Sequence, residues 1–591
     1  MTAALDPQRS VAATGLVADF HAAGGLGWAD VHAARQLTYL YGDTDERVAL
    51  AVGLCVRALR AGSVCLELTA VAESTAGFGD EAVSIPDELW PEPAAWLQAL
   101  RDSPLVSDGD QAPGGRPLRL VGSLLYLERY WQEEEQVRVE LQRRQQPWNQ
   151  APVDPALAAR VRAAFPSVEE ASQRAAAQRC LTSTLTVIAG GPGTGKTTTI
   201  ARILALLLAE DPTRRVALAA PTGKAATRMD EAIRSARRQL PAEDAARLAP
   251  LTARTLHRLL GWTPQGRNRF VHDADNPLPH DVVVVDELSM VSLTMMSRLL
   301  AATGRHTRLI LVGDPDQLAS VEAGAVLADI TRASWGSGGA AGGGPVVGLR
   351  HNFRFDGRIG ALAAAIRAGD ADAALDLLAT GGDEVSLTTP GESLDRLRER
   401  VVSVGAEVDR LARGERIEEA LRRFDSHRLL CAHRQGPQGV SHWARVAEGW
   451  LREGVPGFGA EGEWYTGRPL LMTTNSADLG LYNGDAGLVV RLDGQPRVYF
   501  ATGTGLRAFS PYVLSGTQTM FAMTVHKAQG GQFEAVSLIL PPPESPLLTR
   551  ELLYTAVTRA TGQVALYGSA ESVRRAIARP ARRASGLRDR L

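Results

Sequence analysis

The chain has 591 residues and a formal net charge of −2, and 45% of its residues are hydrophobic while 22% are charged. This length exceeds what one hydrophobic core can organise, so we expect about three or four domains with the composition of a globular protein. No apolar run is long enough to cross a membrane, the amino terminus lacks a signal-peptide pattern, and the four cysteines are scattered, so we expect a cytoplasmic protein without a cysteine-framed metal site.

The first 155 residues fall into two predicted parts. Residues 1–110 are typical of a helical domain, and the nearly continuous apolar run from Val48 to Leu59 predicts a buried helix. Residues 111–155 form a connector, in which the strand-like run LRLVGSLLYL precedes a charged helix. The three consecutive glutamates at 133–135 of that helix are expected to face solvent, and residues 147–155 are expected to form a linker.

Two blocks of alternating helix and short apolar strand follow, the first over residues 156–350. This alternation predicts parallel sheets flanked by helices, which is an α/β fold class. Residues 485–518 interrupt the second block with short strand-like pieces, so we expect a small β insertion within a second α/β domain of residues 351–484 and 519–575. The expected strands are 185–189, 216–220, 282–285 and 309–312 in the first block and 428–432, 536–540 and 563–567 in the second.

The run GGPGTGKT follows the first of these strands and precedes a helical segment. Strand, glycine-rich turn and helix N-terminus are together the context of a phosphate-binding loop, whose backbone N–H groups close around phosphate oxygens. Lys196 is expected to reach the β- and γ-phosphates, and the Thr197 hydroxyl to bind Mg²⁺. A chance glycine turn with a surface lysine is the weaker interpretation, because the flanking pattern fits. The predicted nucleotide-binding residues are Gly190, Gly191, Pro192, Gly193, Thr194, Gly195, Lys196, Thr197 and Thr198.

Two further apolar strands end in polar residues at what should be the same edge of the sheet. VVVVDE places Asp286 and Glu287 after a buried strand, where Asp286 would hold Mg²⁺ and Glu287 would polarise the attacking water. The alternative is a strand that merely ends in two solvated acids. LVGDPDQL ends the next strand, and its Gln317 is expected to sense the γ-phosphate and to link it to DNA contacts.

Taken in order, these runs resemble the motifs of superfamily 1 helicases across roughly residues 170–565. Within that superfamily the chain resembles the RecD branch, through GGPGTGKTTT, LLCAHRQGPQGV, YNGDAG and the basic run at the carboxyl end. The runs that match the superfamily are GGPGTGKT, APTGKAATRM, TLHRLLG, VVVVDELSM, LVGDPDQL, LRHNFRF, TVHKAQGGQF and LLYTAVTRA.

The resemblance implies roles for residues at matching positions. Gln173 matches the family's adenine-reading glutamine, although it could instead be a plain surface residue. Arg354 and Arg559 match arginines that reach the nucleotide from the second motor domain, which would make hydrolysis depend on closure of a cleft. Either histidine of the implied DNA face could instead be structural. The positions that match this face are Pro221, Thr222, Thr255, His257, Asn483, Thr524, His526 and Lys527.

Two stretches bear on how DNA would be handled: a predicted hairpin and a run that departs from the family pattern. Residues 262–279 match the place where relatives carry a β-hairpin that can separate strands, and Gly266 and Asn268 suit its turn. The chain also departs from the K-S-Q-G-S-E-F run of many RecD-like chains, which removes hydroxyl groups and a carboxylate near the junction of nucleotide and DNA. The replacing residues are Ala528, Gly531 and Gln532.

For the fold, the resemblance implies two RecA-like motor domains that bind ATP and Mg²⁺ in the cleft between them. A helical N-terminal domain that docks on a partner and a small SH3-like β insertion would complete the chain. A basic tail, residues 576–591, either contacts DNA or a partner or is solvated, and we favour solvation.

For the activity, the resemblance implies an ATP-dependent DNA helicase that moves 5′→3′ along single-stranded DNA. It also implies assembly with RecB and RecC into exonuclease V, a nucleoid-associated complex of double-strand break repair and homologous recombination, with nuclease action left to a partner. One rival is a stand-alone RecD-like helicase, which the lack of a helix-hairpin-helix pattern in residues 1–150 disfavours. The other is a non-motor ATP-binding scaffold, which the intact Lys196, Asp286 and Glu287 disfavour.

Overall fold

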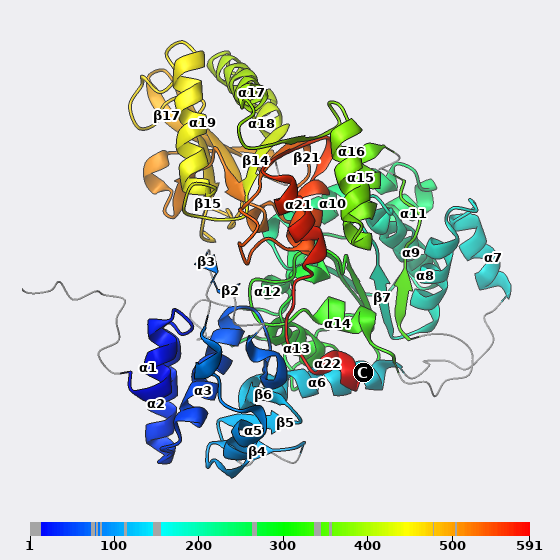
Figure 1. The fold of residues 1–591 in the computed structure, drawn as a ribbon. Coiled ribbons are helices and arrows are strands. Elements are labelled where there is room, and N and C mark those ends of the chain that lie inside the picture. The colour runs from blue at the N-terminus through cyan, green and yellow to red at the C-terminus, as the bar shows by residue number, and fades with distance from the viewer. Residues whose placement is uncertain are drawn as a thin grey trace, which may run out of the picture.

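The computed structural model describes residues 13–72, 77–78, 81–82, 85–110, 115–145, 155–262, 269–335, 344–353, 357–476, 478–502 and 505–591. The chain forms four parts: an N-terminal unit in blue, a first α/β domain in cyan to green, a second α/β domain that ends in red, and a β insertion in orange within the second domain (Figure 1). Within the described residues, no helix combines the length and the apolar character that a bilayer span requires.

The N-terminal unit packs helices against a small sheet with the strand order β1-β6-β5-β4. The apolar run that predicts a buried helix forms α3, which places Leu50 and Leu54 in the core. The expected boundary at residue 110 falls inside this sheet, because β4 pairs with β5 in parallel and sets Val106 opposite Leu118. The elements are α1 (Gly15–Ala22), α2 (Trp28–Tyr41), α3 (Glu46–Arg60), β1 (Leu66–Glu67), η1 (Leu68–Ala70), β2 (Gly77–Phe78), β3 (Glu81–Ala82), η2 (Asp87–Leu89), α5 (Pro93–Asp102), β4 (Val106–Asp108), β5 (Leu118–Val121) and β6 (Leu124–Leu127).

Helix α6 (Glu128–Gln145) joins the N-terminal unit to the first α/β domain. The sequence predicts that its three consecutive acids face solvent, which is wrong for Glu133 and Glu134, since both are buried. Glu133 accepts a hydrogen bond from Thr294 at 2.6 Å, and Glu134 accepts one from Tyr126 at 3.1 Å. These acids therefore bind hydroxyl groups of the surfaces that α6 packs on, instead of water. The predicted linker at 147–155 lies outside the described residues up to residue 154.

The first α/β domain is built on a parallel sheet with the order β12-β7-β11-β10-β8-β9. Strands β7, β8 and β10 have the predicted bounds, and β11 is one residue longer at each end. Alternate residues of β10 face two separate cores, so helices cover both faces of the sheet. The elements are α7 (Pro155–Ala164), α8 (Ala171–Thr182), β7 (Leu185–Ala189), α9 (Lys196–Glu210), β8 (Val216–Ala220), α10 (Gly223–Arg237), α11 (Ala242–Arg247), β9 (Ala253–Thr255), α12 (Leu256–Leu259), β10 (Val282–Val285), η4 (Leu288–Met290), α13 (Leu293–Ala302), β11 (Arg308–Gly313), α14 (Val326–Arg332) and β12 (Val346–Gly348).

Two predicted loops of this domain are only partly described. Residues 263–268, which include Gly266 and Asn268, lie outside the described residues, and residues 269–279 adopt turns and bends without a strand. The strand-separating hairpin therefore stays a prediction. The Gly-rich loop expected before β12 lies outside the described residues from 336 to 343.

The second α/β domain repeats this plan with the strand order β13-β22-β21-β14-β20, again in parallel. Its three predicted strands correspond to β14, β21 and β22. The elements are α15 (Arg358–Ala368), α16 (Ala371–Thr380), β13 (Val385–Thr388), α17 (Asp395–Arg413), α18 (Ile417–Asp425), β14 (His427–Cys431), α19 (Val440–Gly454), β20 (Met523–Thr524), η6 (His526–Ala528), β21 (Phe533–Ile539), α20 (Arg550–Val557), β22 (Ala560–Tyr567) and α21 (Ala570–Ala578).

The β insertion is an antiparallel sheet with the order β18-β17-β16-β15-β19 and its own core around Val489 and Phe500. It is wider than the predicted 485–518, because β15 and β19 pair at its base and set Leu470 opposite Thr519. The elements are β15 (Pro469–Met472), β16 (Ala486–Leu492), β17 (Gln495–Thr502), β18 (Gly505–Phe509), η5 (Pro511–Val513) and β19 (Thr517–Thr519).

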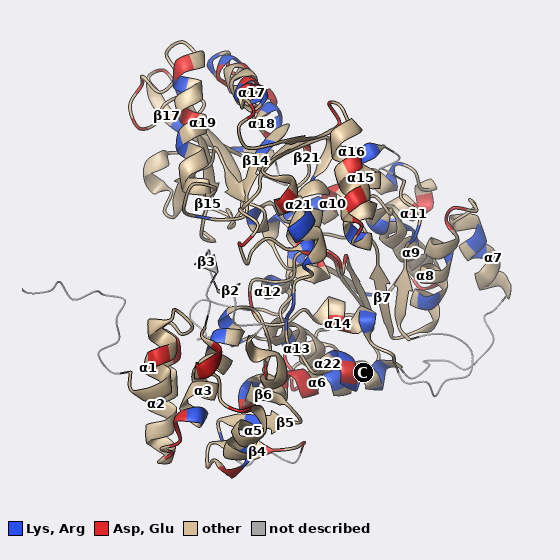
Figure 2. Ribbon diagram, viewed as in Figure 1, with Lys and Arg blue, Asp and Glu red and all other residues tan. Residues whose placement is uncertain are grey.

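The segment after α21 carries a run of arginines and leads back to the N-terminal unit (Figure 2). The prediction that this tail is solvated is wrong. The carbonyl of Ala584 accepts a hydrogen bond from the backbone N–H of Val64 at 2.8 Å, and Leu587 of the terminal helix α22 (Leu587–Arg590) is fully buried. Arg590 forms salt bridges with Glu134 and Glu135 of α6. The tail therefore binds the second α/β domain to the opposite end of the molecule.

Candidate nucleotide cleft and nucleic-acid face

The predicted phosphate loop lies between β7 and α9, at the carboxyl edge of the first sheet. Gly193 and Gly195 have φ angles of +84° and +76°, which residues with side chains rarely adopt. The Lys196 ammonium donates to the carbonyls of Gly190 and Gly191 at 2.7 and 3.0 Å, so it lies within the curve of the loop.

The loop fits the phosphates of ATP. The first N–H groups of α9, which begins at Lys196, have no intrahelical acceptor, and the helix dipole places positive potential at this end. A Cβ atom at Gly190 would lie 2.7 Å from the Thr194 hydroxyl oxygen, so the tight backbone curve depends on glycine there. Backbone donors and a lysine ammonium thus converge on one small volume, as polyphosphate binding requires.

Two neighbours hold the loop from outside. Gln173 is buried on α8 and its side-chain amide donates to the carbonyl of Thr194 at 3.2 Å, so it is not a surface glutamine. The backbone N–H of Phe353 donates to the carbonyl of Gly193 at 2.9 Å. Arg354, which the resemblance brings to the nucleotide, follows Phe353 directly and lies outside the described residues.

The two acids after β10 differ in how they are held. Asp286 is half-buried and accepts a hydrogen bond from the backbone N–H of Glu287 at 2.8 Å. Burial, and then the neighbouring Glu287, raise the pKa of Asp286, while Lys196 opposes that rise. Glu287 has a φ of +54°, a strained conformation for a non-glycine residue that is common at functional sites. In the part of the chain that the structure describes, Asp286 forms no salt bridge. A carboxylate without a salt bridge, beside a phosphate loop, suits Mg²⁺.

Side chains of the second α/β domain reach the same edge of the first sheet. The hydroxyl of Tyr554, on α20, donates to Asp314 at 3.2 Å, and the amide of Gln317 donates to the same carboxylate oxygen at 2.9 Å. The hydroxyl oxygen of Thr555 accepts a hydrogen bond from the backbone N–H of Leu318 at 2.9 Å. Gln317 is thus tied through Asp314 to the opposite domain.

Arg559 lies buried at the end of α20, where its guanidinium donates to the carbonyls of Gly531 and Thr555 at 3.2 Å each. A Cβ atom at Gly531 would lie 2.8 Å from the carbonyl oxygen of Ala528, so the serine of other RecD-like chains would require a shift here. Gly531, one of the positions that depart from the family run, therefore supplies a backbone carbonyl to Arg559.

Arg228 connects this group to the first domain. It projects from α10, and its guanidinium donates to the carbonyl of Gln532 at 3.5 Å. Burial, and then the nearby charge of Arg559, lower the pKa of Arg228 to about 10, while Glu287 opposes the shift. Arg228 therefore lies near both the predicted catalytic acid and the arginine of the opposite domain.

The predicted DNA contacts of the first domain follow the neighbouring strands β8 and β9. The hydroxyl of Thr222, which follows Pro221, accepts a hydrogen bond from the third backbone N–H group of α10 at 3.2 Å. The hydroxyl of Thr255 accepts one from the third backbone N–H group of α12 at 3.3 Å. His257 is exposed, packs edge-on against Trp262 at 6.0 Å between ring centroids, and has a pKa lowered by burial of part of the ring. Because β8 and β9 pair in parallel, two capped helix N-termini lie side by side at the carboxyl edge of the sheet, separated from the strand of the phosphate loop by β10 and β11.

The predicted DNA contacts of the second domain differ in how far they are exposed to solvent. Thr524 is buried and accepts a hydrogen bond from the backbone N–H of Lys527 at 3.3 Å, so it shapes the turn after β20. Burial, with two arginines nearby, lowers the pKa of His526 to about 4, which makes its ring neutral at pH 7. Asn483 is exposed in the loop before β16, where its backbone N–H donates to the side chain of Asn475 at 2.9 Å.

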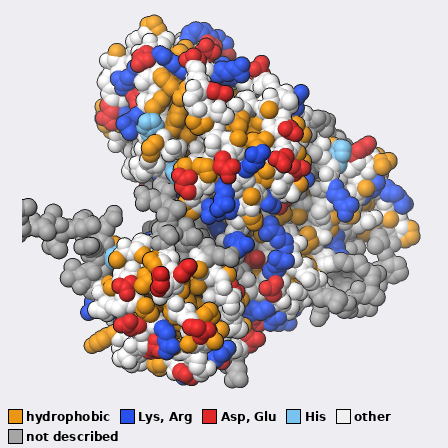
Figure 3. Space-filling view, viewed as in Figure 1, with side chains coloured by type: hydrophobic (Ala, Val, Ile, Leu, Met, Phe, Trp, Pro, Cys, Tyr) orange, Lys and Arg blue, Asp and Glu red, His pale blue; other side chains and the backbone are white. Residues whose placement is uncertain are grey.

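Basic side chains gather along the middle of the face that Figure 3 shows, over the C-terminal segment.

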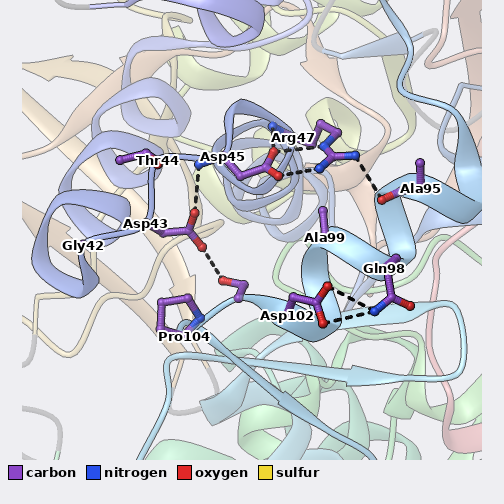
Figure 4. A pocket seen from close by; sticks show the side chains of 11 residues that line it. Gly42, Asp43, Thr44, Asp45, Arg47, Ala95, Gln98, Ala99, Asp102 and Pro104 are labelled. Atoms are coloured by element: carbon purple, nitrogen blue, oxygen red, sulfur yellow. Dashed lines mark hydrogen bonds and ion pairs between the residues drawn. The ribbon is translucent and has the colours of Figure 1, made fainter.

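A separate cavity of about 450 Å³ lies in the N-terminal unit, between the start of α3 and α5 (Figure 4). Its polar groups bind one another: Ser103 donates to Asp43 at 2.5 Å, and Arg47 pairs with Asp45 at 2.6 Å. These pairs use the groups that a ligand would need, and we assign none to the cavity.

Several residues in the cleft have no role in the sequence interpretation, although they belong to runs that carry the resemblance. The motif runs that contain these residues were visible in the sequence. Their roles, however, depend on how the two domains pack, which the spacing of residues along the chain does not reveal. Gln529, for example, donates to the carbonyl of Leu318 across the cleft at 2.7 Å. The others are Arg228, Asp314, Tyr554 and Thr555.

Three family models match the chain. "RecBCD enzyme subunit RecD, N-terminal domain" matches residues 22–126, "AAA domain" matches 173–323, and "UvrD-like helicase C-terminal domain" matches 519–567. The first match ends at the last strand of the N-terminal sheet.

Individual relatives extend these matches. The chain is 50% identical to "RecBCD enzyme subunit RecD" of Mycolicibacterium smegmatis, over 95% of this chain and 97% of that protein. It is 48% identical to the protein of the same description from Mycobacterium tuberculosis, over 99% of this chain and 98% of that protein. The "ATP-dependent RecD2 DNA helicase" of Deinococcus radiodurans is 32% identical over 67% of this chain but 48% of its own length. A crystal structure of Pif1 helicase from Bacteroides with ADP-AlF3 and ssDNA has 18% identity and a TM-score of 0.37, covering 64% of this chain and 88% of that one.

Proposed function

This chain belongs to the RecD family of DNA helicases, and from that premise we propose that it uses ATP hydrolysis to move 5′→3′ along single-stranded DNA and to separate duplexes. One observation carries this proposal: the second α/β domain binds Asp314 and Leu318 at the nucleotide edge of the first, through Tyr554 and Thr555. A change at the phosphate loop therefore has a direct path to the opposite domain. Strands β8 and β9 of the same sheet lead into the predicted DNA contacts of the first domain.

The residues of the cleft divide the work of phosphoryl transfer among them. Lys196 and the N–H groups of the loop bind phosphate oxygens, Thr197 and Asp286 hold Mg²⁺, and Glu287 orients the attacking water. When bound, Mg²⁺ neutralises the charge that develops on the phosphates. Arg559 and Arg354 add positive charge from the second domain, so that hydrolysis requires closure of the cleft.

We further propose that the chain is the RecD subunit of a complex with RecB and RecC that acts in double-strand break repair and homologous recombination, with the N-terminal unit docking on a partner. The near-complete overlap with mycobacterial RecD subunits supports this, whereas the RecD2 helicase shares less than half of its length with this chain. Affinity capture of the tagged chain from its own cells should recover RecB and RecC in equal amounts. A processive monomer without partners would favour the stand-alone rival.

The direction of movement is tested with duplexes that carry a single-stranded overhang at either a 5′ or a 3′ end. The full chain with ATP and Mg²⁺ should separate the 5′-tailed duplex and leave the 3′-tailed duplex intact. Unwinding of the 3′-tailed substrate alone would contradict the proposed polarity, and ATP hydrolysis that DNA does not stimulate would favour the scaffold rival.

A further inference from the structure

One side chain of the β insertion, Tyr482, lies on the first α/β domain. It belongs to the loop between β15 and β16, which a tight turn holds: the backbone N–H of Tyr482 donates to the carboxylate of Asp485 at 2.7 Å, and the N–H of Asp485 donates to the carbonyl of Tyr482 at 3.0 Å. This reciprocal pair fixes the direction in which the tyrosine projects.

The ring of Tyr482 packs on Gly223, the first residue of α10. A Cβ atom at Gly223 would lie 2.9 Å from Cγ of Tyr482, closer than real side-chain contacts allow. Gly223 is not among the described glycines with positive φ, so the backbone would accept alanine. The ring of the opposite domain, and not the backbone, is what requires glycine here.

The hydroxyl of Tyr482 accepts a hydrogen bond from Nη1 of Arg258 at 3.1 Å. Arg258 is exposed on α12, three residues after Thr255. Among the residues that the structure describes, no carboxylate lies within salt-bridge distance of it. A guanidinium has five donors, and this one is held by a neutral partner that leaves its charge uncompensated.

We propose that Arg258 binds a phosphate of the DNA strand and that Tyr482, reaching from the other half of the motor, positions it. The inference rests on the proposed helicase function. Thr222, Thr255 and Asn483 are the neighbouring residues of the predicted DNA face, and hydroxyl, amide and guanidinium groups together suit sequence-independent phosphate contacts. Because Tyr482 moves with the second domain, the orientation of Arg258 depends on closure of the cleft, which ties the grip on DNA to the state of the nucleotide.

The phosphate contact is tested by the salt dependence of single-stranded DNA binding to the full chain. Arg258→Ala should weaken binding and lower the slope of log affinity against log salt by about 0.7, the value expected for one lost phosphate contact on a single strand. The matched control is Arg234→Ala, which removes an exposed arginine from the same domain, on α10, eleven residues or about 16 Å along the helix from Gly223. That control should leave the slope unchanged.

The positioning role is tested with Tyr482→Phe, which keeps the ring and removes only the hydroxyl. Binding should weaken roughly two- to tenfold, as expected for one lost hydrogen bond, and the difference in affinity between the states with ADP and with a non-hydrolysable ATP analogue should narrow. In an Arg258→Ala background the same change should have no effect. Gly223→Ala, which displaces the ring, should act in the same direction as Tyr482→Phe.

The outcomes separate this inference from the function on which it rests. A wild-type chain that fails to bind single-stranded DNA would contradict the proposed helicase. A wild-type chain that binds DNA and hydrolyses ATP normally, while Arg258→Ala keeps the wild-type salt slope, would overturn only the phosphate contact. If the losses of DNA affinity caused by Tyr482→Phe and by Arg258→Ala multiply in the double variant, the two residues act independently, and the positioning role is overturned.

Discussion

Two regions of the molecule enclose carboxylates in opposite ways. Where the C-terminal segment meets α6, Glu134 is fully buried and is bound by the hydroxyl groups of Tyr126 and Ser585 and by the guanidinium of Arg590. In the cleft, Asp286 receives one backbone hydrogen bond, and its surroundings raise its pKa. The first acid has the hydroxyl partners and the cation that a buried charge needs, whereas the second forms no salt bridge among the described residues, which is why we propose that it holds Mg²⁺.

This contrast separates structural from functional charge in one chain. A satisfied buried ion pair holds parts of the fold together, so breaking it should lower stability and leave the chemistry intact. A carboxylate whose surroundings raise its pKa costs stability in the folded chain, and sites that keep such groups usually do so for activity.

Lys196→Gln should reduce DNA-stimulated ATP hydrolysis at least about a hundredfold, because it removes a charge aimed at the phosphates. Its unfolding free energy should stay near that of the wild type, since the ammonium binds only loop carbonyls. Steady-state hydrolysis and urea unfolding on the same preparation measure both. A variant that still hydrolyses ATP at the wild-type rate would place catalysis elsewhere.

Arg590→Ala should lower the free energy of unfolding by about 3–5 kcal/mol, because it leaves Glu134 charged and buried without its cation. DNA-stimulated hydrolysis below the unfolding transition should change little. The matched control is Arg588→Ala, which removes an exposed arginine from the same short helix and should be close to neutral. Equal losses in the two variants would mean that the buried pair is not special.

The double change Glu134→Gln with Arg590→Met should recover part of the stability that Arg590→Ala loses. Buried ion pairs can be replaced by uncharged groups of similar volume at little cost, because the desolvation penalty goes with the charges. Urea midpoints of the single and double variants measure the recovery. A double variant as unstable as Arg590→Ala would show that the geometry of the anchor, and not its charge, sets the cost.

His427 extends the comparison to a buried base. Burial, with three arginines nearby, lowers the pKa of His427 to about 3. As pH falls below about 6.5, the histidine therefore binds a proton in the unfolded chain but not in the folded chain. Stability should therefore fall with decreasing pH, by up to about 1.4 kcal/mol per unit from this residue. Unfolding of wild type and His427→Gln between pH 7 and 5 should show a shallower decline in the variant; parallel curves would contradict this.

How much of the molecule the sequence predicts depends on the range of the interactions involved. Strands such as β7 and β10 were predictable to the residue, because buried apolar runs bounded by turns are a local signal. The phosphate loop and the two acids after β10 were predictable because the chemistry needs those residue types at strand ends.

What the sequence did not predict involves contacts between distant segments. Glu134 looked like part of a solvated acidic face because nothing near it in sequence reveals that residues 585 and 590 return to cover it. Tyr554 and Asp314 are 240 residues apart, and only the packing of two domains joins them. Local patterns therefore predict a candidate nucleotide site but not the contacts between domains that would make it part of a motor.

The most direct test of the division is to measure DNA-stimulated ATP hydrolysis and the free energy of unfolding together for Asp286→Asn and Glu134→Gln, each of which removes one carboxylate charge. We expect Asp286→Asn to lose hydrolysis while keeping or gaining stability, and Glu134→Gln to lose stability while keeping hydrolysis below its unfolding transition. Normal hydrolysis in Asp286→Asn, or loss of hydrolysis in a folded Glu134→Gln chain, would contradict it.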